Sequence, residues 1–439
     1  MPVGDGREQD LGFSGAFSIG IGGIVGGGIF ATIGIAVAEA RGSAPLSFVV
    51  GGVVALLTAY SYSRLSLTFP DAGGTVAFVN RGFGFGYVAA SLNTLLVFSY
   101  AVIMALYANA FATYAASLLP AREGALRTEL IAAGVLVLFA LLNARRAEQM
   151  ERIEAALNAV KLAVLGAFVL LGLTASGMTA ERLGPAEWVA PPDIFVTGML
   201  VFLSYEGFEL IANASPRVQR PARNLPLAFF GSITLAMALY VAIVAVAVGR
   251  LPFEVLEAKR SYALAAVAET FMGSAGFVVM ALGAVVAAAS AINADFYGST
   301  RLVAMLAESG PAPWRRAGVI WGGHPWQMIL ITVVAVLSAT LLDLHALSAV
   351  SSAGFLLVFA AVNASNLRLA RETASVRWVS GIGVMACLGA LGAMLSQAGG
   401  QRAHRHEVFI IAALAVAPFV YRAGDRAVRM LRRRLRTKT

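Results

Sequence analysis

Twelve long apolar segments with few charges, joined by short polar connections, constrain the fold of this chain more than any other feature. About 20 apolar residues span the hydrocarbon core of a bilayer as a helix, and the alternating pattern of a membrane β-barrel strand is absent. Only 13% of the 439 residues are charged, against about a quarter in soluble proteins. The sequence therefore predicts an all-α membrane protein with twelve transmembrane helices. The predicted spans are residues 13–37, 44–69, 86–119, 128–144, 153–176, 193–213, 226–249, 262–298, 326–342, 344–367, 378–397 and 407–421.

The charge distribution predicts the orientation of these spans. Basic residues gather in alternate connections and in the tail at 422–439, which contains the run RAVRMLRRRLRTK. By the positive-inside rule, both termini face the cytoplasm, and the chain is a multi-pass protein of the cell membrane. The net charge of +9 then reflects contact with anionic lipid and not with nucleic acid. No connection is long enough for a soluble domain, so residues 1–439 are expected to form one membrane domain.

The first span contains the run GIGGIVGGGIF at 20–30, which is rich in a residue that weakens helices. Close helix packing through GxxxG spacing explains small residues but not the triplet Gly26, Gly27 and Gly28, and a dinucleotide fingerprint has different spacing. Each glycine costs roughly 1 kcal/mol relative to alanine, so the triplet predicts an interrupted helix. Free backbone groups inside a bilayer are tolerated only where they line a cavity or are satisfied by a bound group.

An interrupted span offers opposite partial charges to a ligand. The N-terminus of the second half-helix suits a carboxylate, and the carbonyls that end the first half suit an ammonium group. A second interruption is expected in the sixth span, where FLSYEGFEL at 202–210 places polar residues in an apolar segment. Two such spans predict an inverted repeat of five plus five helices. The repeats would be 13–176 and 193–367, followed by two extra helices at 378–421 and the tail at 422–439.

Four motifs resemble signatures of the amino acid–polyamine–organocation superfamily of transporters. They are GGGIF in the first span, FPDAGGTVAFVNRGFG at 69–84, FLSYEGFE in the sixth span and STRLVAMLAESGPAP at 299–313. The stretches at 204–229 and 158–172 are most similar to the ApcT-type proton-coupled amino-acid transporters. The resemblance implies the fold of the LeuT transporters with discontinuous helices 1 and 6, alternating access, and amino-acid uptake of broad specificity.

The resemblance also implies the substrate-binding residues. The substrate carboxylate would meet N–H groups of the glycine triplet, and its ammonium group would meet carbonyls of both interrupted spans. The implied donors are Gly26, Gly27 and Gly28, and the implied acceptors are the carbonyls of Ile24, Leu203, Ser204 and Glu206. Phe208 would border the side-chain pocket and act as a thin gate.

Lys161 lies about 12 Å into the fifth predicted span at 1.5 Å per residue, deeper than an interfacial anchor. Burial disfavours the charged form of its amine, so the residue is suited to release and regain a proton. The resemblance places this amine where sodium-coupled relatives hold their second sodium ion, beside the carbonyl of Gly22 and the hydroxyl of Ser290. We therefore expect proton symport that is independent of sodium, with the proton as coupling ion and no metal or other cofactor.

Two further acidic residues leave alternatives open. Glu209 has either a gating role, as the resemblance implies, or a structural role in which free N–H groups satisfy its carboxylate. The side chain of Glu206 either faces the cavity and admits cationic substrates or turns away from it.

The sequence leaves alternatives to symport open. An exchanger of amino acids, their products or polyamines is the main alternative, although a strict exchanger needs no titrating ion site. A channel or a nutrient sensor of the same fold is a further one. An intramembrane enzyme would need a nucleophile, a base or metal ligands on facing spans, and the sequence indicates none. The single cysteine, Cys387, excludes an intrachain disulfide. The expected partners are small amino acids and the lipid bilayer, and the sequence does not indicate an oligomeric state.

Overall fold

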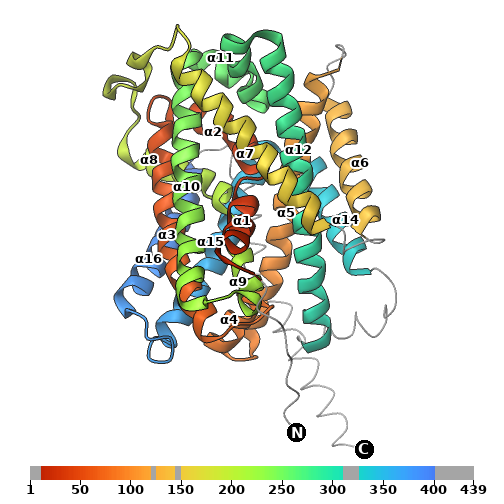
Figure 1. The fold of residues 1–439 in the computed structure, drawn as a ribbon, viewed down its shortest axis with the longest axis vertical. Helices are drawn as coiled ribbons and strands as arrows, with labels where there is room; N and C mark the ends of the chain where they lie inside the picture. Colours follow the sequence, from red (N-terminus) through yellow and green to blue (C-terminus); the bar gives the residue numbers. More distant parts are fainter. Residues whose placement is uncertain (1–10, 120–124, 144–149, 310–325, 401–439) are drawn as a thin grey trace, which may run out of the picture.

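The computed structural model describes residues 11–119, 125–143, 150–309 and 326–400. Within these ranges the chain forms a bundle of helices (Figure 1). The α-helices are α1 (Phe13–Ile24), α2 (Gly28–Ala40), α3 (Ala44–Thr68), α4 (Gly74–Phe83), α5 (Tyr87–Ser117), α6 (Ala125–Asn143), α7 (Met150–Thr174), α8 (Pro191–Leu200), α9 (Leu210–Ala214), α10 (Pro221–Arg250), α11 (Phe253–Ala258), α12 (Ala263–Ser309), α14 (Trp326–Leu341), α15 (Leu344–Arg368) and α16 (Arg377–Gly400). A 3-10 helix, η3 (Val201–Tyr205), follows α8.

Eight helices in the described part of the chain are long and apolar enough to cross a membrane. The pair α1 and α2, bent by 47° at a short break, counts as a ninth span, and α14 is apolar but shorter. Helical segments occupy every predicted span up to residue 397, whereas the predicted span at 407–421 lies outside the described residues. An all-helical protein with several apolar spans is therefore confirmed. The number twelve and the five-plus-five repeat stay predictions.

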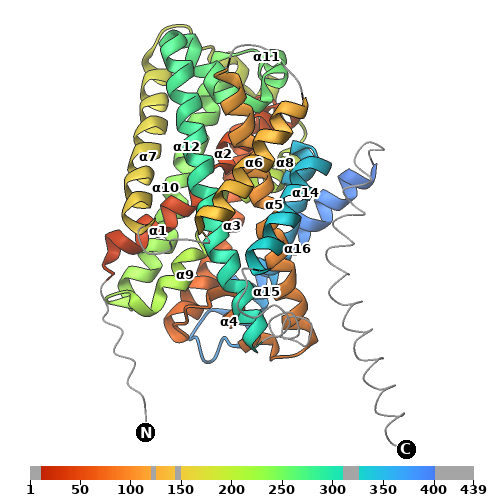
Figure 2. The ribbon, with the colours of Figure 1, turned by 90° about the vertical axis from the view of Figure 1, so that its right-hand side faces the viewer.

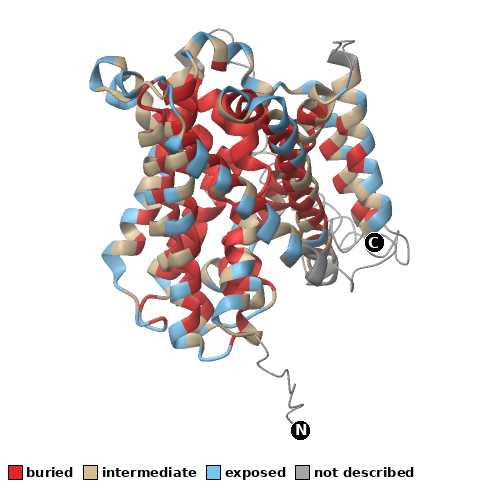
Figure 3. Ribbon diagram, turned by 45° about the horizontal axis from the view of Figure 1, so that its top comes forward, coloured by how far each residue is buried: buried red, intermediate tan, exposed pale blue. Residues whose placement is uncertain are grey.

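The helices differ in how far they are buried. Most residues of α5 and α15 are buried at the centre of the bundle, whereas α6, α7 and α16 lie at its edge (Figures 1 and 2), and the exposed positions gather on the outside (Figure 3). The edge helices expose large apolar side chains, which is the surface that a lipid environment requires. These side chains include Leu130, Val137, Leu138 and Leu141 on α6, Val160, Leu170 and Leu173 on α7, and Trp378, Ile382 and Met385 on α16.

Helix α12 is longer than the span predicted for it. It runs on to Ser309 and is kinked at Gly273, where φ is 66°. Only glycine adopts this left-handed conformation without strain, so the kink has a local cause. Helix α12 packs along α5 and α7, and Phe271, just before the kink, contacts Phe168 of α7 at 5.5 Å between ring centroids.

A buried arginine joins α10 to the C-terminal end of α7. The guanidinium of Arg250 donates to the carbonyl of Gly172, with Nε at 3.0 Å, and to those of Ala175 and Ser176. The last carbonyls of a helix have no intrahelical donor and carry partial negative charge, so a cation stabilises this end. Arg250 thus fixes one end of the helix that carries Lys161.

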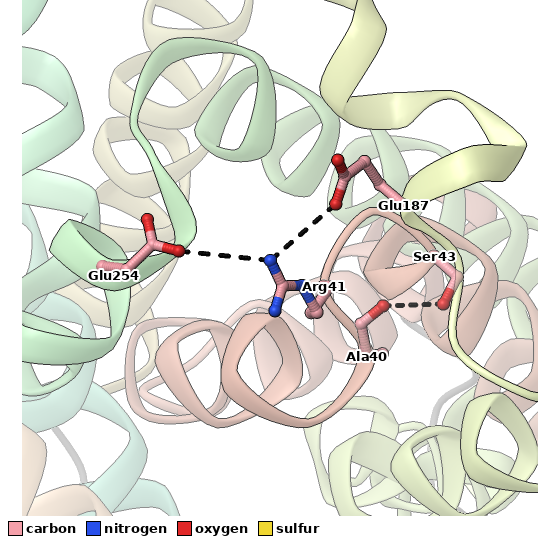
Figure 4. Close-up of polar contacts among 5 residues, drawn as sticks. All are labelled: Ala40, Arg41, Ser43, Glu187 and Glu254. Atoms are coloured by element: carbon pink, nitrogen blue, oxygen red, sulfur yellow. Dashed lines mark hydrogen bonds and ion pairs between the residues drawn. The ribbon is translucent and has the colours of Figure 1, made fainter.

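An exposed ionic cluster lies at the C-terminal end of α2 (Figure 4), and the break between α1 and α2 is at the other end of this helix. The guanidinium of Arg41 lies 3.8 Å from Glu187, in the connection before α8, and 4.0 Å from Glu254 in α11. The side chains of Arg41, Glu187 and Glu254 are 50%, 42% and 77% exposed, so solvent screens their attraction. The cluster joins three elements but contributes little to stability.

Candidate functional site

The two interrupted segments meet at the centre of the bundle. Helix α1 ends at Ile24 and α2 begins at Gly28, so regular helix is absent at 25–27. In the other segment, α8 passes into η3, the backbone of Glu206 is extended at ψ 147°, and α9 begins at Leu210. The α2 helix packs against both η3 and α8, which brings the two interruptions together.

Glycines allow the backbones of the two segments to touch. A Cβ atom on Gly23 would lie 2.7 Å from the carbonyl oxygen of Gly207, and a Cβ on Gly207 would overlap the backbone of Gly23. Gly207 also has φ of 110°, a conformation that residues with side chains rarely adopt. Close approach and backbone conformation therefore both require glycine here.

Each residue of the glycine triplet faces a different element. An added Cβ would lie 3.1 Å from Ala291 on α12 for Gly26, 2.8 Å from Tyr107 on α5 for Gly27, and 3.0 Å from Ser204 in η3 for Gly28. The N–H of Gly26 already donates to the carbonyl of Ile24 at 2.8 Å. The first N–H groups of α2, which include those of Gly27 and Gly28, have no intrahelical acceptor and suit an anion.

The carbonyls that precede the two breaks, those of Ile24 and Ser204, share a donor that the sequence did not indicate. The hydroxyl of Tyr240, on α10, donates to the carbonyl of Ile24 at 2.8 Å and to that of Ser204 at 3.1 Å. Leu203 accepts from the N–H of Glu206 at 3.0 Å. A single side chain therefore links the last turn of α1 to η3.

The side chain of Ser204 is tied to the second half of the first interrupted span. Its hydroxyl lies 2.8 Å from the hydroxyl of Thr32, which itself donates to the carbonyl of Gly28 at 2.9 Å. Through Thr32, the start of α2 and η3 are held together at a second point besides the Gly23–Gly207 contact.

Glu209 accepts hydrogen bonds from the interrupted backbone and from a tyrosine of α5. One carboxylate oxygen accepts from the N–H of Gly207 at 2.8 Å, and the other accepts from the hydroxyl of Tyr100 at 3.0 Å. This is the structural alternative considered for Glu209, because the turn frees an N–H that the carboxylate pairs. The gating role stays a prediction.

Glu206 is buried beside the glycine triplet, with 3% of its surface exposed. One carboxylate oxygen accepts from the hydroxyl of Tyr107 at 3.2 Å, and the other has no hydrogen-bond partner among the described residues. Since the ring of Tyr107 lies against Gly27, the carboxylate belongs to the same region as the α2 N-terminus. Its side chain is therefore turned inward and not toward the surface.

Phe208 packs in an aromatic cluster contributed by three helices. Its ring centroid lies 5.4 Å from that of Tyr62 on α3, 5.3 Å from Phe359 on α15 and 6.5 Å from Phe229 on α10. The cluster places Phe208 in the core, directly after the Gly207 turn. Whether it borders a substrate and acts as a gate stays a prediction.

Lys161 lies between the first interrupted span and α12. Its ammonium nitrogen is 3.3 Å from the carbonyl of Gly22 and 3.3 Å from the hydroxyl of Ser290, and the residue is 2% exposed. The structure therefore brings together the three residues expected at the coupling site. Asn158, one turn earlier on α7, packs against Gly22 where a Cβ would otherwise lie.

Sequence reasoning missed several polar side chains of the site. They are Thr32, Tyr100, Tyr107, Asn158 and Tyr240. For Tyr100 and Tyr107 a signal exists, because a spacing of two helical turns puts them on one face of α5. No local pattern marks Tyr240, which is the single tyrosine of α10 and has apolar neighbours on both sides in the sequence.

The chain is similar to known proteins over nearly its whole length. Residues 11–425 match the family model described as amino acid permease. The inner membrane transport protein YbaT of Escherichia coli K12 is 31% identical over 375 residues, covering 84% of this chain and 86% of its own length.

Two other relatives are similar over shorter or comparable stretches. An uncharacterized protein of Methanocaldococcus jannaschii is 30% identical over 368 residues, which is 83% of this chain and 84% of its own length. The chloroplastic cationic amino acid transporter 9 of Arabidopsis thaliana is 25% identical over 338 residues, which is 71% of this chain and 57% of its own length.

Proposed function

The chain belongs to the amino acid permease family, and from this premise we propose that it takes up amino acids by proton symport through alternating access. The family and the transporters among its relatives make the protein a membrane transporter and not an enzyme. Proton coupling, sodium independence and broad specificity are the proposed refinements of that activity.

The amino-acid site is proposed at the meeting point of the interrupted segments. The N–H groups at the start of α2 suit the substrate carboxylate, and four carbonyls suit its ammonium group, those of Ile24, Leu203, Ser204 and Glu206. These groups are contributed by the two segments that pack through Gly23 and Gly207. A zwitterion would bridge the segments, so binding would bias how they sit relative to the other helices.

The contact of Lys161 with Gly22 and Ser290 is the observation that carries proton coupling. A charged amine can donate to both oxygens and hold α1 against α12, whereas a neutral amine holds them more weakly. Protonation would then be linked to the arrangement of the interrupted span, and through it to substrate binding. A strict exchanger needs no such group, so this contact favours symport over exchange.

Uptake into proteoliposomes tests the proposal. With an inward pH gradient and no sodium, the wild-type protein should accumulate labelled amino acid, and adding sodium should not change the rate. Lys161→Gln lacks a titrating amine, and Lys161→Arg keeps a charge that cannot be released. Both should lose gradient-driven accumulation.

A matched substitution controls for the loss of a lysine. Lys259 lies after α11, outside the site, so Lys259→Gln should accumulate substrate as the wild type does. Accumulation by Lys161→Gln at the wild-type level would contradict the coupling role. A panel of the twenty amino acids, scored by thermal stabilisation in detergent, identifies the preferred substrates.

The expected location is the cell membrane, with both termini in the cytoplasm. The apolar spans and the similarity to an inner membrane transport protein support a multi-pass membrane protein. Protease accessibility of tags at each terminus, in intact cells and in inverted vesicles, tests the orientation.

A further inference from the structure

Tyr240 is buried in α10, and its hydroxyl reaches both interrupted segments. It donates to the carbonyl of Ile24 at 2.8 Å and to the carbonyl of Ser204 at 3.1 Å. These carbonyls end the helical turns that precede the two breaks, and they are among the groups proposed to receive the ammonium group of a substrate.

The acceptor capacity of Ile24 is already full in this arrangement. A carbonyl oxygen has two lone pairs, and that of Ile24 accepts from the N–H of Gly26 as well as from Tyr240. An arriving ammonium group must therefore take the place of one of these donors. The hydroxyl is the easier one to replace, because it retains the carbonyl of Ser204 as a second acceptor.

After a symporter releases its substrate inside, its empty binding site must open again to the outside before the next substrate can bind. While the site is empty, no ammonium group is present, and without Tyr240 the carbonyl of Ile24 would keep only the N–H of Gly26. A missing hydrogen bond at this depth is costly. We propose that Tyr240 is a resident hydrogen-bond donor that replaces the substrate's ammonium group at Ile24 and Ser204 while the empty binding site changes from inward-open to outward-open. This inference rests on the proposed function, since only net uptake requires the empty binding site to change sides of the membrane.

The environment of Tyr240 suits this role. Its ring packs against Phe48 at 5.8 Å and Tyr205 at 5.5 Å between centroids, so the hydroxyl is held in place. The hydroxyl has one hydrogen to share between two carbonyls, whereas an ammonium group has three donors and a charge. A substrate can therefore displace it from Ile24, and the hydroxyl can return when the substrate leaves.

Tyr240→Phe removes the donor and keeps the ring. In counterflow, the binding site changes sides of the membrane only while substrate is bound, so exchange of labelled for unlabelled amino acid should be unchanged. Net accumulation driven by a pH gradient requires the empty binding site to change sides of the membrane. The rate of net accumulation should therefore fall about tenfold. Equilibrium binding of the substrate should tighten, because no resident donor competes with the ammonium group.

Tyr205→Phe is the matched control. Its hydroxyl donates to a backbone carbonyl too, that of Phe48 at 2.6 Å, and Tyr205 is as deeply buried, but neither interrupted backbone receives its bond. This substitution should change counterflow and net accumulation by the same factor. A role of Tyr240 in stability alone would give that same pattern, so the ratio of the two rates separates the explanations.

Each outcome bears on the inference. Equal changes of exchange and net uptake in Tyr240→Phe overturn it, as does weaker substrate binding. If the wild-type protein exchanges amino acids but does not accumulate them with a pH gradient, the proposed function fails before any variant is compared, and the inference falls with it. If Tyr240→Phe cannot be recovered from membranes, Tyr240→Leu, which also lacks a donor, must show the same loss of net uptake relative to exchange.

Discussion

Gly23 and Gly207 touch backbone to backbone where the two interrupted segments meet, and a Cβ on Gly23 would lie 2.7 Å from the carbonyl oxygen of Gly207. The contact joins segments that are far apart in the sequence. Since carbonyl and half-helix ends from both segments gather around it, the geometry of the proposed substrate site depends on this contact.

Gly23→Ala tests the contact directly. The added methyl group meets backbone, which cannot move aside as a flexible side chain can. The free energy of unfolding should therefore fall by about 1–3 kcal/mol. Transport should be lost as well. Gly389→Ala is the control, because nothing lies within 4 Å of its added Cβ in α16, and alanine there should stabilise the helix by about 1 kcal/mol. Equal thermal stability and uptake in both variants would contradict the close packing.

Glu206→Gln tests whether this carboxylate selects cationic substrates. In the wild type, lysine and arginine should compete with uptake of a neutral amino acid, because the carboxylate beside Tyr107 attracts a second positive charge. The glutamine variant should weaken that competition about tenfold while it transports neutral amino acids as before. Competition that is unaffected by the substitution would remove Glu206 from the selection of substrates.

Glu209→Ala should lower stability, because it leaves the N–H of Gly207 and the hydroxyl of Tyr100 without their acceptor. The expected loss is about 1–3 kcal/mol, measured by thermal unfolding in detergent. Glu209→Gln keeps one acceptor oxygen and should lose less. If both variants unfold like the wild type while transport stops, the residue acts in gating and its structural role is minor.

Arg250→Ala and Arg41→Ala should differ sharply in stability. Arg250 donates to three carbonyls at the end of α7 while buried, so its loss should cost about 2–3 kcal/mol. Arg41 makes two exposed ion pairs, and its loss should cost at most about 1 kcal/mol. Thermal unfolding of the two variants side by side checks the difference, and an equal loss would contradict it.

The sequence by itself determined the helical class and the places where helices weaken. Apolar runs of membrane length and consecutive glycines act through local costs of the backbone, which do not depend on distant residues. The run at 20–30 thus predicted an interruption, and α1 does end at Ile24. The set of Lys161, Gly22 and Ser290 came from family resemblance, since no local rule brings three separate spans together.

Only the tertiary structure decided which side chains complete the site. Tyr240 lies 216 residues from Ile24, and nothing near it in the sequence distinguishes it from other aromatic residues of apolar helices. Its partner is set by the packing of α10 against α1, in the same way that packing sets the partners of Glu206 and Glu209. A lone donor gains a role only when folding places an unsatisfied carbonyl within reach, which is a property of the assembled bundle.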